Sequence, residues 1–297
     1  MRRIVFFNRY TRAMEEEEVF GGALLKFVYT TAIGHLTFAG LCRRKIFSAL
    51  LGKLASAQGS RRRILPFIEK YGLKADSFER KIGDFTSFND FFSRKLKPSA
   101  RPISPKPDTI SSPVDGRHLA YKSAKDLSPF FVKGEDFSVE ELTLDRKISE
   151  KFSGGSVLIS RLCPVDYHRF HFPVDCVPGK TFLIGGGYAS VNPIAMAGKI
   201  ETFLKNKRMT TLIRTDTCGD VLMVEIGATG IGSIKQTFVP EQPTLKGSEK
   251  GYFECGGSAV ILIFEVGRIK FSDDVLANTA QGTETYVLMG DEIATIL

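Results

Sequence analysis

A serine follows two glycines near the carboxyl end of the chain, ahead of the apolar run 259–265. Because glycine has no Cβ, a neighbouring hydroxyl can approach its carbonyl carbon closely. A strained turn at this point would therefore let Ser258 Oγ attack the carbonyl of Gly257. The attack needs a base that takes the hydroxyl proton and a group that orients the base. A Gly-Gly-Ser turn before a strand is also common, so this pattern alone is a weak signal.

The sequence offers few partners for such a serine, because it contains only four histidines. His168 and His171 lie close together between two prolines, and Asp115 lies in a Pro-Val-Asp-Gly segment. Asp115, His171 and Ser258 thus supply the acid, base and nucleophile of a triad from three separate segments. Extended backbone would point positions 168 and 171 to opposite faces, so serving one site requires a bend. Each histidine could instead be an ordinary core or surface residue, and an aspartate before glycine is a common turn.

Short apolar or β-branched runs between Gly, Pro and Asp turns follow residue 108 and predict strands. They cover residues 156–160, 181–184, 209–214, 221–226 and 259–265, whereas residues 137–150 and 194–206 have helical patterns. The predicted body is therefore mainly antiparallel β, similar to a barrel-sandwich, with helices at its edge. The expected fold class is α+β.

Four prolines, at positions 98, 102, 105 and 107, separate this body from a section that is helical in pieces. Proline removes a backbone donor and interrupts helices. We therefore place a boundary after residue 107, with a helical section over residues 1–107 and a β-rich domain over residues 108–297.

The excess of positive charge lies in the first 63 residues. They hold 12 Lys+Arg and four Glu, a net +8, and the remaining residues hold 29 of each sign (41 − 12 and 33 − 4). A nucleic-acid enzyme would more often spread basic residues along its binding face. A basic and apolar section on a neutral body instead favours an anionic membrane surface as partner.

Residues 19–41 are apolar and long enough to cross a bilayer. Lys26, His35 and four glycines within them favour two helices that lie in or on the membrane interface, flanked by basic residues 43–45 and 61–63. A spanning helix and a buried helical hairpin are the alternatives. The mixed charges that follow the basic N-terminus are not those of a signal peptide.

The chain has five cysteines and no CxxC pair, which argues against both a disulfide framework and a zinc ribbon. Free thiols in a reducing compartment fit best. The sequence shows no constellation of metal ligands.

Several segments, by their order and spacing, resemble phosphatidylserine decarboxylases over nearly the whole chain. They are residues 85–98 (FTSFNDFFSRKLKP), 100–103 (ARPI), 112–116 (SPVDG), 166–171 (DYHRFH), 190–193 (SVNP), 224–234 (VEIGATGIGSI) and 250–258 (KGYFECGGS). Each segment is modest alone, and together they are highly specific.

The resemblance implies a proenzyme that processes itself. Ser258 would attack Gly257 and split the chain into a β chain, residues 1–257, and an α chain, residues 258–297, which begins with a covalent pyruvoyl group. The family's autoprocessing triad maps onto Asp115, His171 and Ser258, and its substrate-facing histidine maps onto His168, a candidate for proton transfer. The pyruvoyl group would form a Schiff base with phosphatidylserine, and loss of CO2 would give phosphatidylethanolamine for phospholipid biosynthesis.

The resemblance and the charge pattern together imply a peripheral protein at the cytoplasmic side of the cell membrane. Its expected partners are phosphatidylserine and an anionic membrane surface, with no nucleic acid. The α and β chains would stay together as a heterodimer, and whether they form a homo-oligomer is left open.

The chain departs from the family pattern at two positions. Ala259 stands where threonine is usual, and Lys207 stands where glutamate is usual. The nucleophile itself is retained, so cleavage is still expected, and we have no functional account of Lys207.

Three other functions remain as alternatives at this point. One is a pyruvoyl-dependent decarboxylase of a soluble amino acid. Another is a β-rich binding module, because residues 224–234 and 288–293 resemble lipoyl-like domains. The third is a serine hydrolase with the same triad and an intact chain.

Overall fold

The computed structural model describes residues 4–17, 45–130, 138–187, 204–230 and 233–297. Within these residues the chain combines α-helices with β-sheets, and the sheets dominate. The strands are β1 (Val5–Asn8), β2 (Ala13–Glu16), β3 (Thr109–Ser111), β4 (Gly116–Tyr121), β5 (Val157–Leu162), β6 (Arg169–His171), β7 (Val177–Ile184), β8 (Arg208–Arg214), β9 (Val221–Gly230), β10 (Ile234–Gln236), β11 (Glu249–Phe253), β12 (Gly256–Phe264), β13 (Ile269–Phe271), β14 (Glu284–Val287) and β15 (Glu292–Ile296). The α-helices are α4 (Lys45–Ser56), α5 (Ile64–Tyr71), α6 (Phe88–Phe92), α7 (Val139–Thr143), α8 (Arg146–Lys151) and α11 (Asp273–Ala280).

The described strands form one large sheet and two small ones. The large sheet has nine strands in the order β2-β1-β14-β4-β5-β12-β9-β8-β7, and the small sheets have the orders β10-β11-β6 and β13-β15-β3. Neighbouring strands are antiparallel, except that β1 and β14 are parallel. This confirms the predicted mainly antiparallel body, its five predicted strands and the helical pattern near residues 137–150, which forms α7 and α8. Most of the predicted helical stretch 194–206 lies outside the described residues.

Strand β12 lies in the middle of the large sheet and is buried on both faces. Val260, Leu262 and Phe264 enter a core that the large sheet shares with residues of both small sheets. Ala259, Ile261 and Ile263 enter a second core, which α7 covers on the opposite face. Alternate residues of a strand point to opposite faces, so each side of β12 has its own apolar layer. Burial of each such aliphatic side chain stabilises the fold by about 1.5–3 kcal/mol, which fixes the register of β12.

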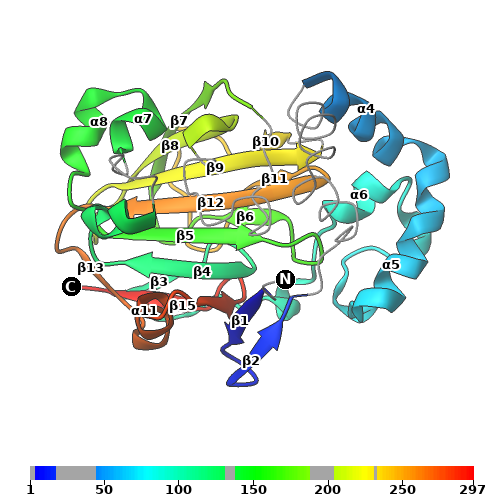
Figure 1. Cartoon of the computed structure of the whole chain (residues 1–297), viewed down its shortest axis with the longest axis horizontal. Coiled ribbons are helices and arrows are strands. Elements are labelled where there is room, and N and C mark those ends of the chain that lie inside the picture. Colours follow the sequence, from blue (N-terminus) through cyan, green and yellow to red (C-terminus); the bar gives the residue numbers. More distant parts are fainter. Residues whose placement is uncertain (1–3, 18–44, 131–137, 188–203, 231–232) are drawn as a thin grey trace.

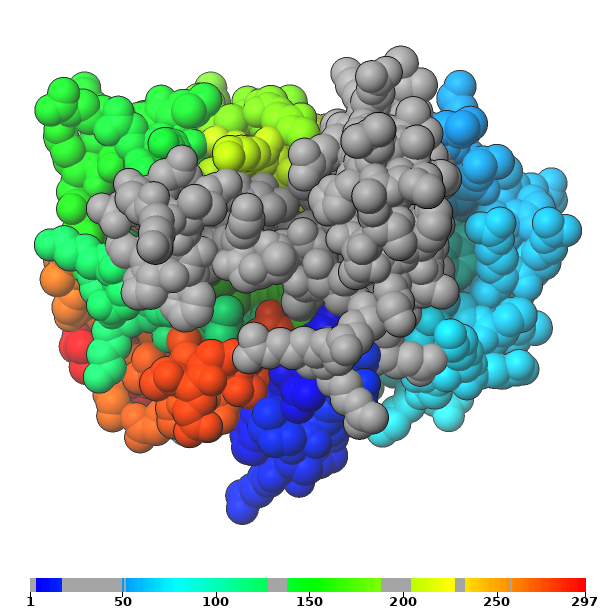
Figure 2. Space-filling model, viewed as in Figure 1, coloured from blue at the N-terminus to red at the C-terminus, as the bar shows by residue number. Residues whose placement is uncertain are grey.

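The first described residues are strands, which differs from the expected helical section over residues 1–107. Strands β1 and β2 form a hairpin that extends the large sheet at β14. In the space-filling view this hairpin, in dark blue, lies against the orange residues of α11, and an ion pair between Arg9 and Asp274 joins the two at 2.7 Å (Figure 2). The hairpin is therefore part of the β body.

Helices do form the rest of the described N-terminal section. Helices α4, α5 and α6 lie together at one end of the body (Figure 1). Phe67, Phe85 and Phe91 belong to a cluster of buried aromatic and aliphatic side chains from residues 64–92, and Val165 of the β body packs against it. The helical section thus docks on the sheet through an apolar contact. The predicted interfacial helices over residues 19–41 lie outside the described residues, and none of the described helices is long and apolar enough to span a membrane.

Candidate functional site

The register of the large sheet brings two of the predicted site residues to the same end of it. Arg161 of β5 pairs with Ala259 on one side and with Arg117 on the other. The next residue of β5, Leu162, pairs with Ser258, and on the other side Asp115 and Gly116 directly precede Arg117. Two strand spacings separate these backbones, about 10 Å. A third side chain is therefore needed to connect Asp115 with Ser258.

Gly116 is required at this end of the sheet because the neighbouring backbone approaches it closely. A Cβ atom at this position would lie 2.8 Å from the carbonyl oxygen of Arg161. A larger residue would push β4 away from β5 and displace Asp115 with it. The Pro-Val-Asp-Gly segment therefore has a structural role in addition to the carboxylate that it carries.

Ser258 lies within strand β12, and the chain before it forms an irregular strand start rather than a turn. Strand β12 starts at Gly256, and its pairing with β9 shifts between Gly256, which faces Gly230, and Ser258, which faces Gly227. The irregularity is thus a bulge in which three residue steps of β9 oppose two of β12. The Ser258 side chain is 1% exposed, and its Oγ has no hydrogen-bond partner.

His168 precedes β6 and is held by two elements. Its carbonyl accepts a hydrogen bond from the backbone N–H of Phe253 at 2.9 Å, and its ring lies 4.0 Å from the ring of Phe92. Its Nδ1 lies 3.0 Å from the carbonyl oxygen of Asp166. Because a carbonyl only accepts, Nδ1 carries the proton, and the buried Nε2, which has no partner, presents a lone pair. Burial lowers the pKa of His168 to about 3, so the ring is neutral.

His171 ends β6 and lies beside the segment that carries Asp115. Its backbone N–H donates to the carbonyl of Pro113 at 2.9 Å. Burial lowers the pKa of His171 to about 4, although the Glu249 and Asp115 carboxylates favour its protonation. Its buried Nδ1 has no hydrogen-bond partner. His171 therefore has a neutral ring, a free nitrogen and an electrostatic interaction with Asp115.

Asp115 is buried, and its hydrogen-bond partners do not include His171. Its carboxylate accepts two hydrogen bonds from the guanidinium of Arg101, one of them at 2.7 Å, and a third from the backbone N–H of Met289 at 2.8 Å. Asp115, His171 and Ser258 are not hydrogen-bonded to one another in the structure. The fold thus brings the predicted triad residues to one end of the sheet and leaves the contacts between them unmade.

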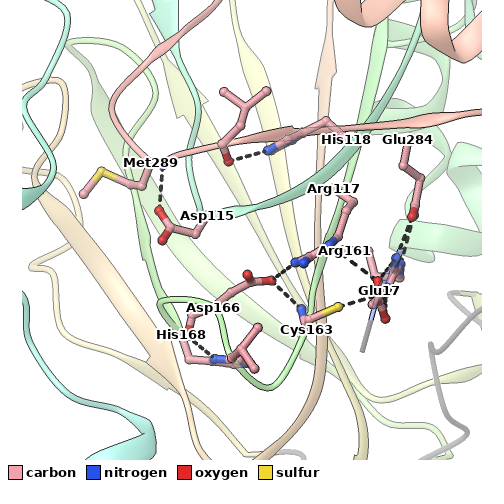
Figure 3. A network of polar contacts seen from close by, with 12 residues as sticks. Glu17, Asp115, Arg117, His118, Arg161, Cys163, Asp166, His168, Glu284 and Met289 are labelled. Atoms are coloured by element: carbon pink, nitrogen blue, oxygen red, sulfur yellow. Dashed lines mark hydrogen bonds and ion pairs between the residues drawn. The ribbon is translucent and has the colours of Figure 1, made fainter. Parts of the chain in front are cut away.

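A network of buried ion pairs lies beside the site (Figure 3). Arg161 contacts Glu17 at 2.7 Å and Glu284 at 2.5 Å, and Arg117 pairs with Asp166. Burial raises the pKa of Asp166 to about 6, and the Arg117 charge opposes that shift. Asp166 directly precedes the histidine loop, which is residues 167–171 and includes β6. The network therefore fixes the backbone from which His168 projects.

His118 shows what a structural histidine looks like in this protein. It is fully buried, its Nδ1 lies 2.9 Å from Ser160 Oγ, and its Nε2 lies 3.4 Å from the carbonyl oxygen of Val287. Both ring nitrogens therefore have partners, whereas His168 Nε2 and His171 Nδ1 have none. The sequence indicated His168 and His171 as site candidates and gave His118 no role.

Arg94 and Asn89 are residues near the site to which the sequence analysis gave no role. Arg94 is 3% exposed, its Nη2 donates to the carbonyl of Val165 at 3.2 Å, and its Nε and Nη1 have no hydrogen-bond partner. Asn89 Oδ1 accepts a hydrogen bond from the backbone N–H of Cys255 at 2.8 Å. Both lie in segment 85–98, which carries part of the family resemblance. That resemblance is the signal that could have indicated these two residues.

The surroundings of Ser258 are enclosed and contain neutral histidines. In the described part of the chain, no three His, Cys, Asp or Glu side chains lie close enough together to hold a metal ion. The Ser258 hydroxyl is enclosed and lacks a partner, and neutral imidazoles lie in the neighbouring loop. A carbonyl formed at position 258 would be shielded from bulk water.

Comparison with known proteins gives a consistent result over nearly the whole chain. A model of the family described as phosphatidylserine decarboxylase matches residues 88–295. A protein of Ruminiclostridium cellulolyticum is 44% identical over 290 residues, 98% of this chain and 97% of its own. Relatives from Chlamydia muridarum and Clostridium botulinum are 42% and 41% identical, each over 98% of this chain and at least 97% of their own. All three are named phosphatidylserine decarboxylase proenzyme.

Proposed function

The chain belongs to the phosphatidylserine decarboxylase family, and we propose that it cuts itself before Ser258 and then converts phosphatidylserine to phosphatidylethanolamine. The observation that best supports this is a group of buried polar atoms without hydrogen-bond partners around the start of β12. They are His168 Nε2, His171 Nδ1 and Ser258 Oγ. Folded proteins rarely leave such atoms unpaired, and chemistry is a recognised reason for doing so.

Self-cleavage begins with the neutral ring of His171, which accepts the proton of Ser258 Oγ. The oxygen then attacks the carbonyl carbon of Gly257, the peptide C–N bond breaks, and an ester replaces it. Removal of the Cα proton of residue 258 expels the Gly257 carboxylate and leaves dehydroalanine. Addition of water and loss of ammonia then give the pyruvoyl group. In this scheme Asp115 stabilises the imidazolium formed on His171, in agreement with the electrostatic interaction between them.

Decarboxylation uses the same end of the sheet. The pyruvoyl carbonyl supplies an electron sink for the pair of electrons left when CO2 departs. The substrate amine arrives protonated, and His168 Nε2, with its free lone pair, accepts that proton. The same nitrogen can return a proton to the substrate α carbon. The buried position of His168 excludes water from this transfer.

We also propose a peripheral association with anionic membranes through the basic N-terminal section. Truncation is a poor test of it, because β1 and β2 belong to the large sheet and Glu17 belongs to the buried ion-pair network. A double Arg62→Gln/Arg63→Gln variant removes two exposed charges instead. It should weaken binding to anionic vesicles by about 1 kcal/mol per charge. A Lys180→Gln/Lys235→Gln variant, with the same charge change on the β body, should bind like wild type.

Vesicle flotation measures both double variants against wild type. Equal binding of all three proteins, or a wild type that stays wholly in solution, would contradict the membrane proposal. The second result would also favour a soluble amino acid as the substrate.

A denaturing gel of mature protein tests the enzymatic proposal. Two bands of the sizes expected for residues 1–257 and 258–297 support self-cleavage. A single uncut band would favour a binding module, or, if Ser258 also reacts with a serine-directed probe, a serine hydrolase. Production of phosphatidylethanolamine and CO2 from phosphatidylserine then identifies the reaction.

A further inference from the structure

We propose that Asn89 of α6 is a positioning residue for self-cleavage, an inference that rests on the proposed function. Its side-chain oxygen holds the backbone N–H of Cys255 at 2.8 Å, across 166 positions of sequence. Cys255 lies two residues before Gly257, whose carbonyl carbon is the point of attack. The helical section would then take part directly in the cut, in addition to packing on the body.

Residues 253–255 lead to the Gly257–Ser258 bond, and their backbone N–H groups are all hydrogen-bonded. The N–H of Phe253 donates to the carbonyl of His168 at 2.9 Å, and that of Glu254 donates to the carbonyl of Ser233 at 3.0 Å. Both acceptors are backbone groups of the β body. The next N–H, that of Cys255, instead donates to the Asn89 side chain. This contact is therefore the last anchor before the two glycines.

The helix that carries Asn89 is itself fixed. Ser87 Oγ accepts from the backbone N–H of Asp90 at 3.1 Å and caps the helix. The N–H of Phe88 donates to Ser60 Oγ at 2.8 Å, and Phe91 is buried in the aromatic cluster. A side chain on such a rigid element holds its partner more precisely than one on a loop.

Precision matters here because glycine has more backbone freedom than any other residue. On one side of the scissile bond, the pairing of β12 with β5 and β9 fixes Ser258. On the other side, Asn89 fixes Cys255 and the pairing with Gly230 of β9 holds Gly256, so Gly257 lies between these contacts and Ser258. Loss of the Asn89 anchor would let the Gly257 carbonyl leave the line of attack, and such misplacement lowers the rate of an intramolecular reaction.

The test compares three variants by the rate at which freshly made precursor is cut. Asn89→Leu removes the acceptor and should slow cleavage about tenfold, the usual value of one hydrogen bond. Asn89→Asp keeps an oxygen that accepts from Cys255 N–H and should cut at nearly the wild-type rate. Arg80→Gln removes the ion pair with Asp90 on the same helix, at 2.5 Å, and should also cut normally.

A second measurement separates positioning from a general loss of folding. Decarboxylation per mole of cleaved chain should be unchanged in Asn89→Leu, because the anchor acts before the cut. Wild-type cleavage in Asn89→Leu, or equal slowing in Asn89→Asp or Arg80→Gln, would overturn the proposal. An uncut wild-type chain would instead overturn the proposed function, so the two failures are distinguishable.

Discussion

Two groups of buried polar side chains lie next to each other at one end of the large sheet. The first is held by ion pairs, although Arg117 Nε makes no hydrogen bond, and the second has three atoms without hydrogen-bond partners. In the first, Arg117 and Arg161 are surrounded by the carboxylates of Glu17, Asp166 and Glu284. In the second, the start of β12 and the histidine loop present Ser258 Oγ, His168 Nε2 and His171 Nδ1, which have no hydrogen-bond partners.

The difference indicates what each group does. Buried charges that find partners hold segments together, here the N-terminal hairpin, β5 and the histidine loop. Buried polar atoms left without partners lower stability, and their persistence points to a reaction that uses them. Variants in the first group should therefore affect folding, whereas variants in the second should affect cleavage or turnover.

The largest effect is expected from Ser258→Ala, which removes the nucleophile. Cleavage and decarboxylation should both be abolished. The free energy of unfolding should stay the same or rise by about 1 kcal/mol, because the lost hydroxyl had no partner in the fold. A denaturing gel and a urea titration measure the two quantities. A marked loss of stability would place Ser258 in the structural group and break the comparison.

The two histidines should then separate the two reactions. His171→Ala should block cleavage, and Asp115→Ala should do the same. His168→Ala should leave cleavage intact and lower decarboxylation per cleaved chain by about 10²–10⁴-fold, the usual contribution of a proton-transfer group. The gel reports the first reaction and CO2 release the second. An uncut His168→Ala chain would show that this division of roles is wrong.

Arg161→Met tests the paired group. It leaves Glu17 and Glu284 without their shared cation, and loss of one partner from a buried ion pair costs about 3–5 kcal/mol. Unfolding in urea measures this loss. Variant protein that remains folded should still be cut. Normal stability together with failed cleavage would contradict the assignment of this network to folding.

The free energy of unfolding should be sensitive to acid through the structural His118 and through the site residues His168 and His171, because all three are buried. Burial lowers the pKa of His118 and His168 to about 3 and that of His171 to about 4. Below their unfolded pKa of about 6.5, the unfolded chain therefore takes up protons that the folded chain refuses. Stability should fall as the pH drops from about 6.5 toward 4. Asp166 acts in the opposite direction. Its pKa rises to about 6 in the folded protein, so the folded chain takes up one proton there that the unfolded chain does not yet bind.

Substitution of one histidine measures how much that histidine contributes to the pH dependence of the free energy of unfolding. His171→Gln should reduce the slope of unfolding free energy against pH by about 1.4 kcal/mol per pH unit. His118→Gln should reduce it equally while leaving cleavage unaffected. Urea titrations between pH 7.5 and 4.5 measure both slopes. An unchanged slope in either variant would mean that the corresponding histidine is charged in the folded protein.

The smallest effect on processing is expected from Ala259→Thr, which restores the residue usual in the family. Ala259 belongs to the core on the face of β12 opposite to Ser258, so a hydroxyl there points away from the reaction. The rate of cleavage should change little, and burial of an unpaired hydroxyl should cost about 1–3 kcal/mol. A pulse-labelled precursor reports the rate. A clear acceleration would show that the threonine hydroxyl reaches the scissile bond.

The sequence predicted the strands well, because their apolar runs lie between clear turn residues. Residues 221–226 and 259–265 became the central strands β9 and β12. It failed at the N-terminus, where β1 and β2 have only four residues each and β1 gains its stability from pairing with the distant β14. Such long-range pairing leaves no local periodicity in the sequence.

The candidate site was predicted in part. The chemical types and the family resemblance indicated Asp115, His168, His171 and Ser258, and the fold places them around one end of the large sheet. Neither source indicated that Asp115 pairs with Arg101 or that Asn89 holds Cys255. These contacts join residues that are distant in sequence, so only the three-dimensional arrangement reveals them.

Mass spectrometry of the purified protein tests the central claim most directly. The account predicts two fragments, residues 1–257 and 258–297, in which the smaller begins with a pyruvoyl group and has no free amine. Ser258→Ala protein, prepared in parallel, should give one intact mass. An intact wild-type chain with an unmodified serine at position 258 would contradict the account.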